Sequence, residues 1–340
     1  FTFVYKNLFL IVFLLTAFIF SWWLMYSTFS YSNGTIFVAS KAWSDFGSHI
    51  PLIRSFSFGW NFPPEYPLFA GEPIHYHFLF YAFVGLLEMI GIPLDISLNT
   101  PSAVLFFALL VMLYLFAVSL FKSKFVGFLS VLFFIFNGSF SFLYYFKDNL
   151  FTIESIKNIT TSTTFNSFHP YYGDNLISAF WNLNIYTNQR HLAAAFAFSL
   201  AIIYIFLRPV LKNKNNESIS VTISLGVLLG LSFYFHIAAF GMTIAMVLLL
   251  SVLFPKIRFS GTVILIIALL LAFPQYKYMN QKESVFSLLL NPGYLTPKPV
   301  TILSFLNYWT LNIGLHVMLI PLGFIFSSKK VKKIFIAFFA

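Results

Sequence analysis

Residues 100–134 read TPSAVLFFALLVMLYLFAVSLFKSKFVGFLSVLFF, and they carry the clearest structural signal in the chain. A turn with Lys122 and Lys124 separates the apolar run 101–121 from a second run, 125–146. A membrane-spanning helix needs about 20 mostly apolar residues. The stretch therefore predicts two spanning helices joined by a short basic turn, and with them an all-α polytopic membrane protein.

The whole chain shares this character. Hydrophobic residues make up 59% of its 340 residues and charged residues only 9%, whereas soluble globular chains carry roughly 25% charged residues. Such a composition excludes a soluble enzyme and a disordered tail. The basic residues behind the net charge of +10 are scattered between apolar runs, so we expect no nucleic-acid partner. Cys is absent, which excludes disulfides, thiol nucleophiles and thiolate metal sites.

Eight complete apolar runs contain no Asp, Glu, Lys or Arg, and a further run begins near the end of the chain. The predicted spans are 8–29, 101–121, 125–146, 191–207, 219–235, 237–254, 260–275 and 303–326, with 334–340 as a partial one. We expect a single transmembrane domain over residues 1–340. Because the chain starts with Phe1 and stops inside an apolar run, we also expect it to be a piece of a longer protein.

Basic residues orient these spans, because short cytoplasmic loops are enriched in Lys and Arg. If 74–92 does not span, the residues on the inside are Lys6, Lys122, Lys124, Arg208, Lys212, Lys214, Lys256, Arg258, Lys329, Lys330, Lys332 and Lys333. The outer loops are then 30–100, 147–190 and 276–302, and they hold nine of the ten acidic residues. We predict an integral, multi-pass protein of the plasma membrane with a cytoplasmic N-terminus. The run 74–92 is then an interfacial or re-entrant helix, too polar for a lipid-facing span.

Asp45 is the first candidate for chemistry, because it is the first acidic residue after the first span. His49 follows at i+4, so a helix would place both side chains on one face. A carboxylate near the membrane surface can act as a general base toward a sugar or phosphate acceptor. The alternative is a solvated aspartate in a local turn.

Arg190 and His191 lie where the second outer loop meets a span, and His236 lies at the tip of an outer hairpin. A guanidinium at that depth matches a lipid-linked phosphate in geometry. Anchoring to ordinary headgroups is the equal alternative. Arg54 is a weaker candidate for the same role.

His75 and His77 could hold a divalent ion together with Glu72, because an extended segment places alternate residues on one face. A helix would point the two rings about 200° apart, which does not suit one metal. We expect no metal or cofactor here, with a divalent ion as the less favoured alternative.

The layout resembles the GT-C superfamily of polytopic glycosyltransferases. A first span is followed by an outer loop with an early acid, an interfacial helix, and the span, basic turn and span of 100–134. This order is similar to the RgtA/B/C/D-like and protein-mannosyltransferase groups. The stretches NFPPEYPLFAG (61–71) and NQRH (188–191) look like a prokaryotic subgroup of this superfamily. The resemblance covers most of residues 1–210 and is weaker afterwards.

The resemblance implies a fold and an activity. The fold would be a bundle of about 8–9 transmembrane helices whose long first outer loop carries an interfacial helix. The activity would be inverting transfer of a hexose from a polyprenyl-phosphate carrier to a lipid, glycan or protein acceptor on the outer face. Asp45 matches the usual catalytic base and Asp148 the second acid. His49, Arg54, Arg190, His191 and His236 would bind substrate.

This chain also departs from the family pattern. Phe46, not a second acid, follows Asp45, which argues against a metal-binding acidic pair. Thr100 stands before Pro101 where a basic residue is common, which moves phosphate binding toward Arg190 or Arg54. The competing readings are a transporter or lipid flippase and a non-catalytic membrane scaffold. The absence of charged residues inside the complete spans disfavours an ion-coupled transporter.

The predicted topology can be tested by cysteine labelling, because the chain has no Cys of its own. Cysteines replacing Ser123 and Asn213 should react with a membrane-impermeant thiol reagent only after permeabilisation. A cysteine replacing Ser162 should react in intact cells. Labelling of Ser123→Cys from outside would show that 74–92 crosses the membrane.

Overall fold

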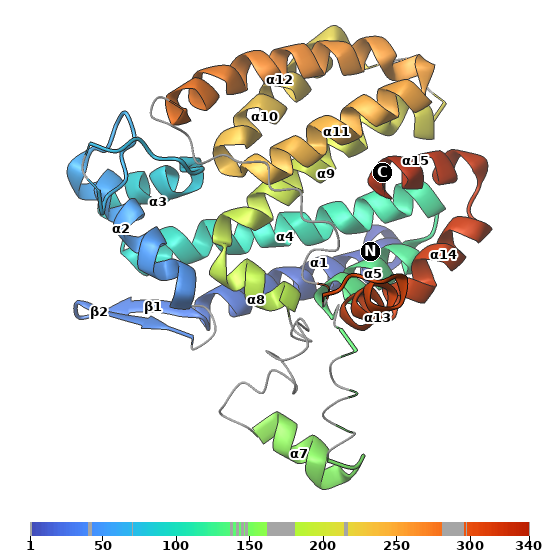
Figure 1. The fold of residues 1–340 in the computed structure, drawn as a ribbon, viewed down its shortest axis with the longest axis horizontal. Helices are drawn as coiled ribbons and strands as arrows, with labels where there is room; N and C mark the ends of the chain where they lie inside the picture. Colours follow the sequence, from blue (N-terminus) through green and yellow to red (C-terminus); the bar gives the residue numbers. More distant parts are fainter. Residues whose placement is uncertain are drawn as a thin grey trace. The chain divides into compact units, whose positions relative to one another are not determined.

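The computed structural model is mostly helical (Figure 1). It describes residues 2–39, 43–69, 71–136, 139, 140, 143, 146, 149–161, 181–213, 217–280, 296 and 298–339. The chain divides into two compact units. Unit 1 comprises Phe1–Val131, Tyr186–Val285 and Ile336–Ala340, and unit 2 comprises Leu132–Ile185 and Phe286–Phe335. The candidate site lies entirely in unit 1.

Among the described residues, four helices are long and apolar enough to cross a membrane. They are α1 (Thr2–Tyr26), α4 (Leu94–Phe121), α9 (Arg190–Leu211) and α12 (Arg258–Met279), the last preceded by the short 3₁₀ helix η1 (Pro255–Ile257). Large apolar side chains such as Ile19 on α1 and Leu270 on α12 are exposed, as expected for surfaces that face lipid. The expectation of an integral membrane protein is confirmed at this level.

Two expected spans have different bounds in the structure. The helix predicted over 101–121 begins at Leu94, because Pro101 lies inside α4 and does not start it. The buried side chains of Leu94 and Leu98 hold this first part of the helix in place. Of the span predicted over 125–146, the structure describes the helix α5, Lys124–Ile135, with 12 residues, while part of 137–146 lies outside the described residues. At 1.5 Å per residue this helix is too short to cross the membrane by itself.

The predicted span 303–326 is two helices, α13 (Ile302–Ile313) and α14 (His316–Phe326), bent by 89°. Gly314 ends α13 with φ 64° and ψ −137°, a conformation that residues with a side chain rarely adopt. If the bent pair counts as one span, the described chain has up to five. The last helix, α15 (Lys329–Phe339), begins five residues before the predicted run at 334.

The runs 219–235 and 237–254 form the helices α10 (Ile219–Phe235) and α11 (Ile237–Leu253), close to the predicted bounds. Each has 17 residues, slightly short of a typical span. A single extended residue, His236, separates the two helices. His236 therefore ends one helix and caps the next.

The all-α prediction missed a β-hairpin directly after α1. Strands β1 (Phe29–Ser32) and β2 (Thr35–Val38) pair antiparallel. Asn33 and Gly34 form the turn with φ of 51° and 79°, the left-handed values that a two-residue hairpin turn requires. An Asn-Gly pair between aromatic and β-branched residues predicts such a hairpin. The hydropathy of the run 8–29 indicates only the helix that precedes it.

Helix α9 lies at the centre of unit 1 and is the most buried of the four long helices. It contacts α4 on one side and α10 and α11 on another, while α1 packs on α4 and α12 packs on α10 (Figure 1). Unit 1 is thus a bundle in which α9 connects two groups of helices. The residues just before and at the start of α9 reach the candidate site.

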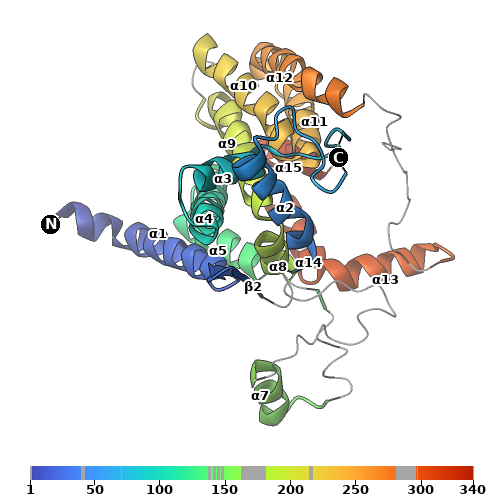
Figure 2. The ribbon, with the colours of Figure 1, turned by 90° about the vertical axis from the view of Figure 1, so that its left-hand side faces the viewer.

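Helices α2 (Trp43–Gly59) and α3 (Leu79–Met89) pack against each other and stand beside one end of this bundle (Figure 2). Within the run 74–92 the structure has the helix α3, with 11 residues, while 74–78 is irregular; its place at the membrane interface stays a prediction. Buried side chains including Phe29, Phe56 and Tyr81 join the hairpin, α2 and α3 in one apolar core. This core fixes the walls of the cavity described below.

Unit 2 includes α7 (Ile153–Thr161), α13 and α14. A backbone hydrogen bond of 2.6 Å from Phe140 to the carbonyl of Leu311 joins its two chain segments. Helix α8 (Trp181–Asn188) starts in unit 2 and ends in unit 1, where it leads into α9.

Close packing of α10 on α12 depends on two glycines, Gly226 and Gly230. A Cβ at Gly230 would lie 2.7 Å from Cβ of Leu271 and 3.2 Å from the carbonyl oxygen of Ala268. A Cβ at Gly226 would meet Ile267 Cβ at 2.8 Å. This spacing is the small-xxx-small pattern that lets membrane helices approach closely.

We expect Gly230→Ala to lower the midpoint of thermal unfolding in detergent. Overpacking a well-packed contact costs about 1–3 kcal/mol, more than the gain of about 1 kcal/mol in helix propensity. Gly241→Ala in α11 is the matched control, because nothing lies within 4 Å of its added Cβ. It should leave the midpoint unchanged or raise it. A Gly230→Ala midpoint at or above wild type would contradict this packing.

Candidate functional site

A cavity of about 510 Å³ opens in unit 1 beside α2. Its wall combines polar, aromatic and apolar side chains. The lining residues are Asp45, Ser48, His49, Leu52, Tyr66, Pro67, Leu68, Ile74, His75, Tyr76 and Gln189. They come from α2, from the loop between α2 and α3, and from the residue that precedes α9.

Asp45 lies in the first turn of α2, where a negative charge interacts favourably with the helix dipole. Its side chain is half-buried, and its backbone N–H donates to Oδ1 of Asn188 over 3.3 Å. His49 follows one helical turn later and lines the same cavity. The predicted i, i+4 arrangement of Asp45 and His49 is therefore present, on a helix within the predicted outer loop 30–100.

His49 is neutral at pH 7. Only 5% of the residue is exposed, and its ring centroid lies 4.5 Å from that of Tyr81. Burial lowers the pKa of His49 to about 4, which the nearby carboxylate of Asp45 offsets only in part. The imidazole can therefore donate or accept one hydrogen bond in the cavity without carrying a charge.

Tyr76 keeps its proton for a related reason. Burial, together with the negative charge of Asp45, raises the pKa of Tyr76 to about 12. A neutral phenol beside a carboxylate provides a hydrogen-bond donor at neutral pH. The cavity thus combines the carboxylate of Asp45 with the neutral imidazole of His49 and the neutral phenol of Tyr76.

The opposite wall is the loop 61–78, which holds itself together by hydrogen bonds. Asn61 and Glu65 exchange two bonds of 2.8 and 2.9 Å, and the Glu65 carboxylate accepts from the N–H of Gly71 at 3.0 Å. The hydroxyl of Tyr278 on α12 donates to the carbonyl of Pro64 at 3.0 Å. This Pro-rich segment is therefore a folded part of the wall.

Arg190 is placed inside the protein and not in the cavity wall. It is 1% exposed, and its guanidinium donates to the carbonyl of Thr187 at 2.7 Å and to Oδ1 of Asn99 at 3.1 Å. It also donates to the carbonyl of Met25 at 3.2 Å and to the hydroxyl of Thr28 at 2.9 Å. These contacts favour a positioning role over direct phosphate binding or headgroup anchoring.

Arg54, the other predicted phosphate-binding candidate, does not line the cavity either. Arg54 forms an ion pair of 3.1 Å with Glu88 on α3, and Glu88 also accepts from the hydroxyl of Ser57. This pair joins α2 to α3. Asp148 lies outside the residues that the structure describes, so its role stays a prediction.

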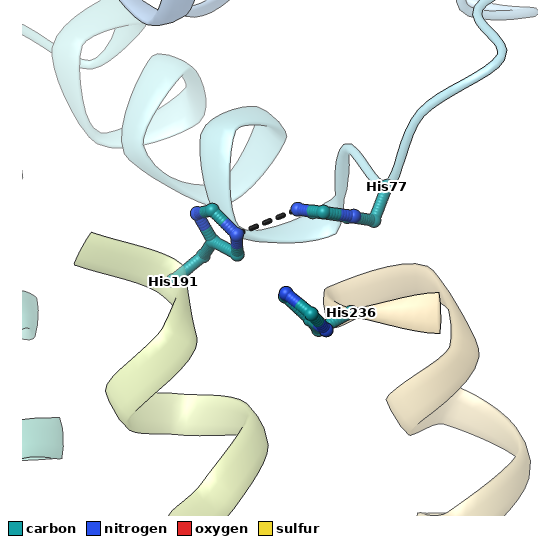
Figure 3. Close-up of side chains that lie close together, drawn as sticks. All are labelled: His77, His191 and His236. Atoms are coloured by element: carbon teal, nitrogen blue, oxygen red, sulfur yellow. Dashed lines mark hydrogen bonds between the residues drawn. The ribbon is translucent and has the colours of Figure 1, made fainter. Parts of the chain in front are cut away.

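His77, His191 and His236 meet one another in unit 1, and none of them lines the cavity (Figure 3). Nε2 of His77 and Nε2 of His191 are hydrogen-bonded at 2.6 Å, and Nδ1 of His191 bonds the hydroxyl of Tyr81 at 2.5 Å. Burial and the neighbouring imidazoles of His236 and His49 lower the pKa of His77, and burial lowers that of His236. Within the described chain, this trio is the group that could hold a metal ion.

His75 and His77, on either side of Tyr76, thus belong to different sites. His75 is exposed and lines the cavity, whereas His77 is 7% exposed and belongs to the trio. The proposed pairing of His75, His77 and Glu72 around one ion is not present in the structure. The cavity is also lined by Ser48, Tyr66, Tyr76 and Gln189, which no sequence pattern marks as site residues. Gln189 belongs to the stretch NQRH, but only the three-dimensional structure shows that it lines the cavity.

Comparison with known proteins gives no assignment. No protein-family model, curated protein or solved structure matches this chain. The cavity and its chemistry therefore carry the functional argument.

We expect Arg190→Lys to destabilise the fold. A lysine cannot reach the four acceptors of Arg190 at once, and each buried acceptor left unpaired costs about 1–3 kcal/mol. Arg208→Lys is the matched control on the same helix, because Arg208 is partly exposed and pairs with Glu217 at 3.5 Å. Thermal unfolding in detergent should show a clear loss for Arg190→Lys and little change for Arg208→Lys. Equal midpoints for both variants would argue against the network.

Proposed function

We propose that this chain is a membrane-embedded glycosyltransferase that moves a sugar from a polyprenyl-phosphate carrier to an acceptor on the outer face of the plasma membrane. The observation that carries the proposal is the half-buried carboxylate of Asp45 in the wall of a 510 Å³ cavity. Ligand cavities typically measure about 300–1,000 Å³ and combine apolar walls with a few polar groups. One carboxylate among neutral donors suits a general base.

The wall of the cavity fits a sugar. The aromatic rings of Tyr66 and Tyr76 offer flat apolar surfaces, and the side chains of Ser48 and Gln189 offer hydrogen bonds to hydroxyl groups. His49 adds a neutral imidazole on the same side as Asp45. A sugar has both apolar faces and hydroxyl edges, so this mixture of groups supports a carbohydrate substrate.

Exposed apolar side chains at the end of α2 and in the loop that lines the cavity support a lipid-linked donor. Phe58, Trp60, Phe62, Leu68 and Phe69 are all exposed, and Leu68 also lines the cavity. Exposed apolar clusters mark contacts with membranes or ligands, and aromatic residues prefer the membrane interface. A donor whose lipid tail stays in the bilayer would present its sugar at this level.

The proposed reaction uses Asp45 as the base. The acceptor hydroxyl gives its proton to the Asp45 carboxylate while its oxygen forms a bond to the anomeric carbon of the donor. The bond from that carbon to the phosphate oxygen breaks, and its electron pair leaves with the phosphate. Attack from the side opposite the leaving group inverts the anomeric centre. We assign the hydrogen bonds to the leaving phosphate to His75 and Gln189, which line the cavity where Arg190 does not.

The proposal includes a bundle of 8–9 spans with a cytoplasmic N-terminus. The four long helices are supplemented by α10 and α11, whose 17 residues reach about 25 Å in a hydrocarbon core of about 30 Å. The bent pair of α13 and α14 would add one more span, and α5 and α15, each too short to cross by itself, would form parts of the remaining ones. The labelling experiment given above tests this arrangement.

Asp45→Asn should abolish most of the transfer. Asn is nearly isosteric but cannot accept a proton at neutral pH, and loss of a general base typically costs on the order of 10²–10⁴-fold in rate. The measurement is transfer from a purified polyprenyl-phosphate-linked sugar to acceptor by the chain in detergent or liposomes. Donor binding, measured separately, should survive the substitution.

Asp95→Asn is the matched control. Asp95 also lies in the first turn of a helix, α4, but it does not line the cavity. Its substitution removes the same kind of helix-dipole interaction and should leave transfer intact. Loss of less than about tenfold in Asp45→Asn would place the base elsewhere. Donor binding without any transfer by the wild-type chain would favour a lipid flippase or a scaffold.

A further inference from the structure

Three histidines from distant parts of the sequence converge in unit 1. His77 comes from the end of the loop before α3, His191 from the first turn of α9, and His236 from the break between α10 and α11. One ring nitrogen of each lies within 4.8 Å of those of the other two (Figure 3). The three rings point toward one another.

We propose that His77, His191 and His236 bind one divalent transition-metal ion of the zinc type. Imidazole nitrogens suit zinc and its neighbours in the first transition row, whereas Mg²⁺ and Ca²⁺ prefer oxygen. Three histidines with one open position form an established ligand set for tetrahedral zinc. The inference is independent of the proposed transfer reaction.

The ring spacing needs only small adjustments. Ligand nitrogens at about 2.0–2.1 Å from a tetrahedral ion lie about 3.3–3.4 Å apart. The nitrogens of His77 and His191 are now 2.6 Å apart in a direct hydrogen bond, and all three nitrogens are within 4.8 Å. Side-chain rotation that separates His77 from His191 and brings His236 inward would therefore complete the site.

Tyr81 orients the central ligand. Its hydroxyl lies 2.5 Å from Nδ1 of His191, and Tyr81 itself is fully buried. If Nε2 of His191 binds the ion, Nδ1 carries the proton and donates to the Tyr81 oxygen. Metal-binding histidines almost always donate their second N–H to such a partner, which fixes the tautomer and the ring.

The hydrogen bond and the partial exposure of His236 determine how easily the metal site can form. Its Nδ1 accepts the N–H of Ala239 at 3.1 Å and so caps α11. Binding through Nε2 places the proton on Nδ1 and gives up this one hydrogen bond, in exchange for a third coordinate bond to the ion. Because His236 is only half-buried, an ion can reach the site from its side.

The bound ion would act structurally on the cavity. His77 directly follows the segment that contributes Ile74, His75 and Tyr76 to the cavity wall, and His191 comes two residues after the lining residue Gln189. One ion would therefore connect both parts of the wall to the helix break at His236.

The experiment measures metal directly. The full chain is purified in detergent with a tag that contains no histidine and without chelators, and its zinc content is determined by mass spectrometry. After metal removal, Co²⁺ is titrated in, and the visible absorption of tetrahedral Co²⁺ is followed. We expect about one equivalent per chain, in keeping with one three-histidine site.

Two ligand variants and one control locate the site. His236→Asn removes the imidazole while Asn retains a good helix cap, and His77→Gln removes a second ligand. Each should weaken Co²⁺ binding by at least about tenfold, because even loss of an outer partner costs roughly 10–100-fold. His75→Ala, two residues from His77 but outside the trio, should bind Co²⁺ as wild type does.

Two results would overturn the inference. Wild-type protein that contains no zinc and gives no tetrahedral Co²⁺ spectrum would show that the trio is a packed set of hydrogen-bonded imidazoles. Unchanged Co²⁺ binding in His236→Asn would place the metal elsewhere. If His77→Gln fails to fold, His236→Asn alone decides, because its half-exposed position and retained cap preserve the fold.

Discussion

The buried guanidinium of Arg190 holds together the part of the protein that contains the site. A charged group can be taken out of water only if its donors find acceptors, and Arg190 finds them on α1, the hairpin segment, α4 and α8. Asn99 extends this network by donating to the carbonyl of Phe29. Because Arg190 fixes the start of α9, it also fixes its neighbours on both sides. Gln189 then lines the cavity, and His191 enters the histidine trio. The cavity and the trio therefore depend on one side chain that belongs to neither.

Hydropathy predicted well where an element is one uninterrupted apolar helix. The bounds of α10 and α11 agree closely with the predicted runs, because polar or charged residues mark their outer ends and His236 marks the break. Hydropathy failed where a single residue changes the backbone without changing the apolar character. Gly314 bends the last long run by 89°, and the Asn33–Gly34 turn reverses the chain inside a stretch of aromatic and β-branched residues. At Pro101 the error was the opposite one, because a helix start was predicted where the helix continues. The buried side chains of Leu94 and Leu98 stabilise the part of α4 that precedes Pro101.

The candidate site could be predicted in part for a similar reason. Asp45 and His49 are local neighbours on one helix, so their spacing was enough to place them together. The trio joins residues that are 114 and 45 positions apart along the chain, and no local pattern connects His77, His191 and His236. The role of Arg190 could not be predicted from the sequence either. A guanidinium at the end of a span can face headgroups, a substrate or the protein interior, and only the positions of its acceptors distinguish these cases.

The acceptors of Arg190 have a further consequence for the electrostatic potential around α9. All four are neutral: two carbonyl oxygens, an amide oxygen and a hydroxyl. The positive charge is thus solvated by dipoles but not cancelled by a carboxylate. It lies at the N-terminal end of a helix, where the backbone dipole adds potential of the same sign. Since salt screens buried charges much less than exposed ones, this positive potential persists at high ionic strength. The region next to Gln189 is therefore electrostatically favourable for an anion, although no Lys or Arg lines the cavity among the described residues.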